Sequence, residues 1–226
     1  MGRATKWLSF AAISLPLLPA YVLAESCDIW ETFDGGFQET WQLSDPDAVR
    51  AIDDVLRVQF SGPSTRDEHA VLDRCVFGNM TLQVRLRDLN STRAKIIEFG
   101  RHGDFAGYGV NFRSDPYNDA VLAYGENDQA EILEIVPYAH SSGQWLQVEL
   151  RVSEALIEVD VDGISLISFD ASAGAAVEGW LSLGGNAGGD GEAYMEFDDL
   201  IISSTDAVGD GLESWGAVKG RFGSQD

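Results

Sequence analysis

The sequence predicts an all-β protein, an antiparallel β-sandwich, and three observations support this prediction. Apolar and polar residues alternate with a period of two in many short runs, the pattern of strands that bury one face. Gly, Asp, Asn and Pro separate these runs, as tight turns require. No long run with helical periodicity interrupts the series, so strands should follow one another directly.

Residues 1–24 have the features of a secretory signal peptide rather than of a folded domain. Two basic residues open the segment, residues 7–23 are almost entirely apolar, and we expect cleavage near Ala24. An uncleaved membrane anchor is the alternative, but the apolar run is short and contains two prolines. No later stretch is long and apolar enough to cross a membrane. We therefore expect a secreted or periplasmic protein.

The mature chain has about 200 residues, a size typical of one all-β domain, which we place at residues 25–203. The full chain carries a net charge of −22, and loss of the two basic residues of the leader makes it about −24. Such a charge repels nucleic acids and anionic lipid surfaces, so neither is an expected partner. It favours cations, basic partners or neutral ligands, and it also keeps a secreted protein soluble.

Cys27 and Cys75 are the two cysteines of the chain, and both follow the leader. An even cysteine count in an oxidising compartment predicts one disulfide, which would tie the first strand to a strand 48 residues later. Two free thiols or a metal pair are the alternatives, but they lack supporting histidines nearby.

The expected strands of the first half are bounded by turn residues. Residues 29–33 alternate and stop at Asp34-Gly35-Gly36, and residues 55–60 stop before Gly62-Pro63. Residues 80–87 alternate most cleanly, so one of their faces should be buried. Further strands are expected at 69–75 and 95–99, with a Gly-rich turn around 103.

The second half continues the same pattern. Residues 108–113 alternate, and shorter apolar runs predict strands at 121–124 and 132–136. Residues 144–152 and 156–163 indicate two strands, the second of which ends in an Asp-Gly turn. The last expected strands are 179–184 and 193–202.

Residues 204–226 form a linker followed by a short amphipathic tail. Gly, Ser, Thr and Asp dominate the first part, as in linkers. Apolar residues then recur at helical spacing, at Leu212, Trp215, Val218 and Phe222. A helix this short is marginal alone, so the tail either packs on the sandwich or docks on a partner, and both interpretations stay open.

Four stretches resemble the concanavalin-A-like jelly rolls, a group that includes laminin-G-like modules and keto-disaccharide hydrolase-like domains. In the hairpin 145–163, a Trp opens the first strand and an Asp-Gly turn closes the second. The others are Phe33-Asp34-Gly35, Gly107–Phe112 and Phe197–Ile202, so the resemblance covers most of residues 27–203. It implies a jelly-roll β-sandwich. This fold hosts lectins, glycanases and adhesion domains, so fold alone does not assign chemistry.

We therefore expect an exported, lectin-like carbohydrate-binding protein without evident catalytic machinery, whose partner is a glycan. A glycoside hydrolase of the laminarinase-like or keto-disaccharide hydrolase-like type is the first alternative. An extracellular adhesion or structural protein is the second alternative. Whether the protein is an enzyme stays open, with binding favoured.

A strand with three carboxylates is the candidate for catalysis. Alternation puts Glu158, Asp160 and Asp162 on one face. The laminarinase-like glycanases that the chain resembles carry a Glu-x-Asp-x-Glu strand on their concave sheet, and retaining hydrolysis needs two carboxyl groups about 5–5.5 Å apart. Here Asp162 replaces the second Glu, and Gly163 makes it a turn residue. A solvated acidic face is favoured, and Glu158 and Asp160 are the catalytic candidates.

Polar side chains of the middle strands are the candidates for ligand binding. Asn111 and Arg113 share the face opposite the apolar residues of 108–112, so they should point away from the core. Asn and Arg can hydrogen-bond sugar hydroxyls, and the nearby Tyr124 can stack on a pyranose ring. The resemblance implies that the concave outer sheet is the ligand platform, and it places Arg101 in the adjoining loop. Ordinary surface polarity is the alternative.

The glycine-rich acidic loop at residues 184–192 is a candidate structural calcium site. Asn186 and Asp190 offer oxygen ligands of the type that Ca²⁺ prefers. The resemblance to sandwiches that hold calcium near their first and last strands adds Asp34 and Asp199. A flexible turn is the alternative, because no complete calcium-ligand spacing is present.

Overall fold

The computed structural model describes residues 27–39, 41–60, 67–89, 95–102, 106–126, 129–186, 193–204 and 208–209. These residues form strands joined by turns, and this part of the chain contains no helix, which confirms the all-β prediction. Accordingly, it also contains no helix that could span a membrane. The predicted leader and the amphipathic part of the tail lie outside the described residues.

The strands form two antiparallel sheets of eight strands each. Sheet A has the order β13 (Ile164–Asp170), β12 (Leu156–Val161), β11 (Leu146–Ser153), β6 (Met80–Asp88), β15 (Ala193–Ser204), β4 (Val55–Phe60) and β3 (Val49–Ile52), and β1 (Ile29–Glu31) also pairs with β15. Sheet B has the order β10 (Gln129–Pro137), β9 (Asp119–Glu126), β8 (Ala106–Arg113), β7 (Lys95–His102), β14 (Gly179–Asn186), β5 (Asp67–Phe77) and β16 (Val208–Gly209), and β2 (Trp41–Leu43) also pairs with β5.

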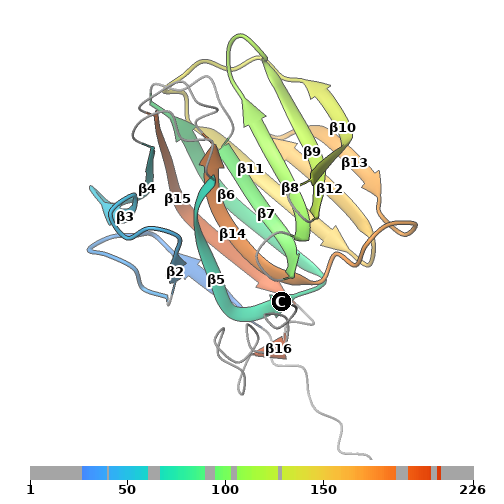
Figure 1. Ribbon diagram of the computed structural model, residues 1–226, viewed down its shortest axis with the longest axis horizontal. Coiled ribbons are helices and arrows are strands. Elements are labelled where there is room, and N and C mark those ends of the chain that lie inside the picture. Colours follow the sequence, from blue (N-terminus) through green and yellow to red (C-terminus); the bar gives the residue numbers. More distant parts are fainter. Residues whose placement is uncertain are drawn as a thin grey trace, which may run out of the picture.

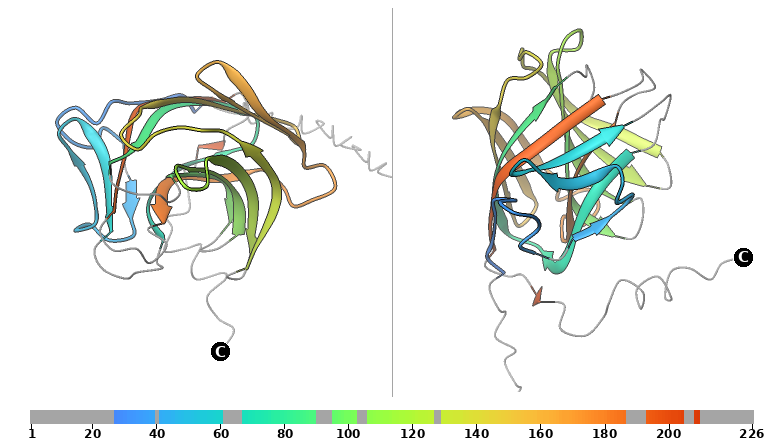
Figure 2. Two further views of the ribbon diagram at one scale, coloured as in Figure 1. Left: turned by 90° about the horizontal axis from the view of Figure 1, so that it is seen from above. Right: turned by 90° about the vertical axis from the view of Figure 1, so that its left-hand side faces the viewer.

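The two sheets stack as layers (Figure 1). Seen from above, both sheets arch in the same direction, with sheet A on the convex side (Figure 2). The face of sheet B that points away from sheet A is therefore concave. This shared curvature is the arrangement of a jelly-roll sandwich, and it gives the molecule one convex and one concave outer face.

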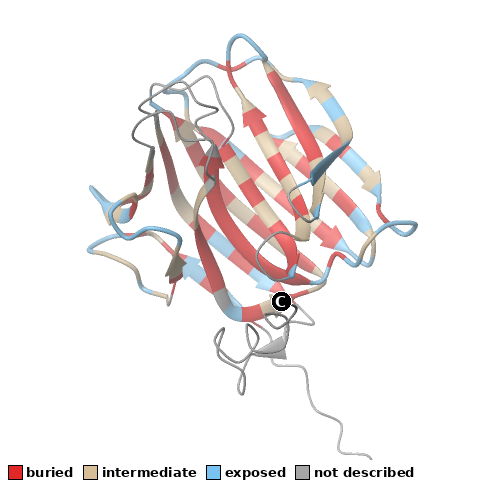
Figure 3. Ribbon diagram, in the orientation of Figure 1, coloured by how far each residue is buried: buried red, intermediate tan, exposed pale blue. Residues whose placement is uncertain are grey.

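The core lies between the sheets and follows from the alternation of the strands. In β6, buried and half-buried positions alternate along the whole strand, so Leu82, Val84 and Leu86 face inward. From sheet B, Val110 and Phe112 of β8 face the same interior. Figure 3 shows buried positions recurring along the central strands of both sheets. Each large apolar side chain buried in this way contributes about 1.5–3 kcal/mol.

Most strands lie where alternation predicts them, but β2, β3, β13 and β16 are not predicted, and the two residues of β16 lie in the expected linker. β2 and β3 have only three and four residues, too few to show a period. β13 follows the Asp162-Gly163 turn, in which both residues have positive φ (52° and 77°), as a two-residue hairpin turn requires. Its alternation is broken because its pairing with β12 shifts register between Val159 and Asp160.

The predicted disulfide is confirmed. Cys27 and Cys75 are bonded, with their Cα atoms 6.5 Å apart. Cys27 precedes β1 of sheet A, and Cys75 lies in β5 of sheet B. The bond therefore ties the start of the domain to the opposite sheet.

A buried ionic cluster also links the two sheets. Lys95, at the start of β7, donates to Asp88 Oδ2 at the end of β6 (2.5 Å) and to His140 Nε2 (3.0 Å). The three residues are 0%, 1% and 6% exposed, in the order Lys95, Asp88 and His140. Because an ammonium group only donates, His140 is neutral and accepts through Nε2, while its Nδ1 faces the Tyr138 carbonyl oxygen at 3.3 Å. Burial lowers the pKa of Lys95, and Asp88 partly offsets this effect.

Acid is expected to weaken the fold through His140. Burial lowers the pKa of His140 from 6.5, and Lys95 lowers it further, against smaller opposing effects of the Tyr138 carbonyl, Asp88 and Asp119. Folded His140 thus stays neutral at a pH where the unfolded chain already binds a proton. The free energy of unfolding should therefore fall as the pH drops below about 6.5.

Denaturant titrations of the wild type and of His140→Gln between pH 7.5 and 5 check this expectation. The variant should lose less stability across this range than the wild type does. Equal losses in the two proteins would show that His140 does not couple protonation to unfolding.

Candidate functional site

The concave outer face of sheet B carries the candidate site. Pairing registers align one row of residues across five neighbouring strands: Ala123, Gly109, Glu98, Ser182 and Val71, on β9, β8, β7, β14 and β5 respectively. Residues aligned in this way point to the same side of a sheet. The flanking positions in β8 are buried core residues, so this row faces away from the core.

Glu98, Arg101 and Ser182 form a hydrogen-bonded trio at the centre of this face. Arg101 Nη1 donates to Glu98 Oε2 at 2.8 Å and to Ser182 Oγ at 3.1 Å. Ser182 Oγ donates in turn to Glu98 Oε2. Ser182 is fully buried, and the side chains of Arg101 and Glu98 are 10% and 29% exposed. Glu98 is therefore the member of the trio that is most available to a ligand.

A β-bulge puts Arg101 on the same face as Glu98. Glu98 pairs with Ser182 and Arg101 pairs with Trp180, so three steps along β7 match two steps along β14. The extra residue turns Arg101 outward, as bulges commonly do near functional sites. Gly100 makes the bulge possible: its φ is +60°, and a Cβ there would lie 2.7 Å from the carbonyl oxygen of Val177. Position 179 also requires glycine, because a Cβ added there would lie 2.3 Å from the Arg101 backbone nitrogen.

Three side chains surround Gly109 beside this trio. A Cβ at Gly109 would lie 3.7 Å from Ile96 Cγ2, 3.8 Å from Asn111 Nδ2 and 3.9 Å from Glu98 Cγ. These are ordinary contact distances, so the position has room for a small group without strain. Ile96 lines this position with a methyl group, Asn111 with its amide nitrogen and Glu98 with its Cγ methylene, which carries the carboxylate further out. An amphipathic molecule could contact all three.

Two of the four predicted ligand residues, Arg101 and Asn111, lie on this face: Asn111 lies beside Gly109, and Arg101 contacts Glu98. Arg101 belongs to strand β7, so the expectation that it lies in a loop is wrong. Arg113 lies on the same face at the end of β8, where Asp119 accepts two hydrogen bonds from it, at 2.7 and 2.6 Å. These bonds to Asp119 raise the pKa of the Arg113 guanidinium. Arg113 is thus already held by a carboxylate of its own chain.

Tyr124 does not lie on this face. It aligns with Tyr108, a core residue, and the two ring centroids are 5.1 Å apart. Tyr124 therefore packs against the core side of sheet B, opposite to Asn111. The expectation that Tyr124 stacks on a sugar beside Asn111 does not fit this geometry.

Glu158 and Asp160, the catalytic candidates, lie on the outer face of sheet A. Arg151 holds both of them, through bonds to Glu158 Oε2 (3.4 Å) and Asp160 Oδ2 (2.9 Å), and it also donates to Glu149. Hydrogen bonds to these carboxylates raise the pKa of Arg151. Since β12 belongs to the convex sheet, neither carboxylate reaches the concave face.

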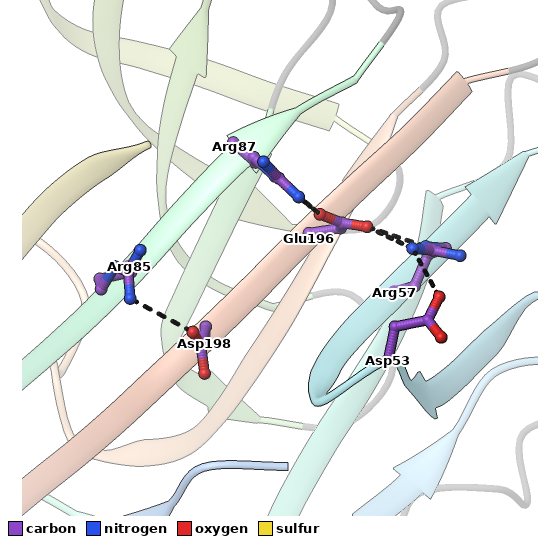
Figure 4. A network of polar contacts seen from close by, with 6 residues as sticks. All are labelled: Asp53, Arg57, Arg85, Arg87, Glu196 and Asp198. Atoms are coloured by element: carbon purple, nitrogen blue, oxygen red, sulfur yellow. Dashed lines mark hydrogen bonds and ion pairs between the residues drawn. The ribbon is translucent and has the colours of Figure 1, made fainter. Parts of the chain in front are cut away.

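The rest of this convex face is also filled with paired charges. Glu196 is fully buried and binds Arg57 and Arg87, each at 2.6 Å, and Arg57 also reaches Asp53 (Figure 4). Arg87 lies over the Trp145 ring, 4.4 Å from its centroid. Charges that are paired in this way hold sheet strands together. The concave face also carries paired charges, and it is the candidate site because Ile96, Glu98 and Asn111 meet there around Gly109.

The calcium candidates divide between described and undescribed positions. The Asp190 position and the Asn186 side chain lie outside the described residues. Asp199 accepts a hydrogen bond from Arg85 at 3.0 Å. Burial raises the pKa of Asp198, and the carboxylates of Asp199 and Asp34 raise it further, against the opposing effects of the Asp199 backbone N–H and of Arg85. Among the described residues no group of three or more His, Cys, Asp or Glu side chains could hold a metal, so calcium stays a prediction.

Glu98 and Ser182 are the site residues that sequence reasoning missed. Glu98 carries one signal: it is the single carboxylate within the apolar strand 95–99, at an outward position. Ser182 carries no such signal, because a small polar residue in a strand does not indicate a site until its neighbours in the sheet are known. The pairing of β7 with β14 brings the two residues together across 84 positions.

No protein-family model and no curated protein matches this chain. Solved structures do match. A carbohydrate-binding module, CBM66 from Bacillus subtilis, gives a TM-score of 0.63 at 12% identity, over 74% of this chain and 96% of that one. A Bacillus licheniformis beta-glucanase gives 0.60 at 12% identity, over 78% and 97%. A lichenase from a mouse hindgut metagenome gives 0.62 at 14% identity, over 79% and 99%. The chain therefore has the concanavalin-A-like jelly-roll fold.

Proposed function

We propose that this chain is an exported protein that binds a glycan on the concave face of sheet B. The observation that carries the proposal is the Glu98–Arg101–Ser182 trio, in which the Glu98 side chain is the most exposed member. Carboxylate and amide groups suit sugars, because a carboxylate accepts from hydroxyl groups and an amide both donates and accepts. Export is supported by the leader-like N-terminus and by the Cys27–Cys75 disulfide.

Binding is favoured over hydrolysis by the placement of the carboxylates. In the described parts of β7, β8, β9 and β14, pairing registers put Glu98 and Asp119 on the outer face. The two positions are four residues apart along the strand direction, about 13 Å. Paired catalytic carboxyl groups lie about 5–5.5 Å apart in retaining and about 6.5–9.5 Å apart in inverting glycosidases. A glycoside hydrolase remains the second candidate, because glucanases are among the structures that share this fold.

Glu98→Gln is expected to weaken glycan binding by about 10- to 100-fold. A hydrogen bond to a charged group contributes about 1.5–3 kcal/mol, and each 1.4 kcal/mol is a factor of about ten in affinity. A glycan array with the wild type first identifies a ligand, and isothermal titration calorimetry then measures the affinity of each variant.

Glu149→Gln is the matched control, since Glu149 is a half-buried carboxylate on the convex sheet that also binds an arginine. It should bind like the wild type. Absence of binding across a broad array, or equal losses in both variants, would contradict the proposal. Release of reducing sugars from the same ligands would favour the hydrolase.

A further inference from the structure

We infer that the concave face takes a neutral sugar residue seated over Gly109 and discriminates against anionic glycans. The inference rests on the proposed glycan-binding function and adds the ligand class and the position of the sugar.

The arginines described on the outer face of sheet B already form ion pairs with carboxylates of this chain. Arg101 binds Glu98, and Arg113 binds Asp119 through two hydrogen bonds of 2.7 and 2.6 Å. Bidentate arginine–carboxylate pairs, such as Arg113–Asp119, are among the stronger polar interactions in proteins. A carboxylate or sulfate on a ligand would have to displace one of these partners before it could bind either arginine.

The group that the trio offers to a ligand is an anion. The Glu98 side chain is 29% exposed, whereas that of Arg101 is 10% exposed, so Glu98 is more accessible to a ligand than Arg101 is. The whole chain adds to this effect, with a net charge of −22. Arg101 offsets much of the charge of Glu98, so a polyanionic glycan is repelled mainly by the field of the whole chain. A neutral sugar has no such penalty and can donate its hydroxyl groups to Glu98.

The surroundings of Gly109 match the two kinds of surface of a sugar ring. Ile96 offers an apolar wall and Asn111 an amide, at 3.7 and 3.8 Å from a Cβ built on Gly109, and Glu98 contacts the same point through Cγ at 3.9 Å, beyond which its carboxylate extends. A sugar ring has C–H faces and hydroxyl edges, so it can contact the apolar and polar sides together. Gly109 has no positive φ, so its role here is the space that it leaves rather than an unusual backbone conformation.

A binding panel at two salt concentrations tests the ligand class. Neutral β-glucans, xylan and levan are compared with alginate, polygalacturonate and heparin in 20 mM and 500 mM NaCl. We expect neutral ligands to bind at least 10-fold more tightly in 20 mM NaCl. Salt should change their affinity less than 2-fold because they carry no charge, whereas the repulsion of anionic ligands is screened within about 10 Å at 0.1 M salt. Tightest binding to an anionic glycan that weakens with salt overturns the inference and leaves the proposed function standing. No binding to either class overturns the proposed function.

Substitutions of increasing size at position 109 test whether the sugar binds over Gly109. Gly109→Ala should reduce the affinity by less than 5-fold and Gly109→Leu by more than 10-fold, with unfolding midpoints near that of the wild type. Asn111→Ala, which creates space instead of filling it, should also weaken binding by about 5- to 10-fold. Wild-type affinity in Gly109→Leu or in Asn111→Ala places the sugar elsewhere on the face and overturns this part of the inference.

Discussion

Lys95→Met is expected to lower the free energy of unfolding by about 3–5 kcal/mol, the usual cost of removing one partner of a buried ion pair. Met keeps most of the length of the side chain, so the change mainly removes the charge. Asp88 would then be a buried carboxylate without a counterion. Among the described residues, its Oδ1 already has no hydrogen-bond partner, and its Oδ2 binds Lys95.

Chemical denaturation at pH 7.5 measures this effect as a shift in the midpoint at constant slope. The double variant Lys95→Met/Asp88→Asn should be more stable than Lys95→Met alone, because it removes the orphaned charge. Arg74→Met is the control: Arg74 pairs with Glu39 but its side chain is 54% exposed, so it should cost at most about 1 kcal/mol. A loss below 1 kcal/mol for Lys95→Met would show that the buried pair does not stabilise the fold.

Replacing both cysteines, in Cys27→Ala/Cys75→Ala, is expected to cost about 4 kcal/mol of stability. The disulfide closes a loop of 48 residues, and the chain-entropy model gives this value for a loop of that length. Both cysteines are buried, so the loss of the two sulfur atoms adds a smaller packing cost. The loss should therefore arise mainly from the greater freedom of the unfolded chain.

Denaturation of the wild type with and without reductant provides the comparison. The reduced wild type should unfold near the midpoint of the double variant, and the variant should not respond to reductant. Free thiols in the unreduced, unfolded wild type, or equal midpoints with and without reductant, would contradict this expectation.

Alternation was enough to predict the orientation of side chains within single strands. It puts Asn111 and Arg113 opposite Val110 and Phe112, and the structure confirms this arrangement. The reason is local: successive side chains of a strand point to opposite faces, whatever the strand packs against. The same reasoning could not place Tyr124, because its face depends on the register in which β9 pairs with β8.

Which sheet a strand joins is a property of the whole chain. Glu158 and Asp160 share one face of β12, as predicted, but β12 pairs with β11 and β13 on the convex side. Nothing within residues 156–163 specifies this choice. It follows from how all the strands bury their apolar faces together, which involves contacts far apart along the chain.

The sequence by itself determined the all-β class, the disulfide and the outward direction of Asn111, because alternation, cysteine count and turn residues act through local geometry. Only the tertiary structure decided that Glu98, Arg101 and Ser182 meet. Their meeting needs the bulge at Gly100 and the pairing of β7 with β14, a strand more than 80 residues away. A bulge moves one side chain to the other face of the sheet and so breaks the alternation of its strand. The partners of that side chain come from a distant strand, so no local pattern in the sequence reveals them.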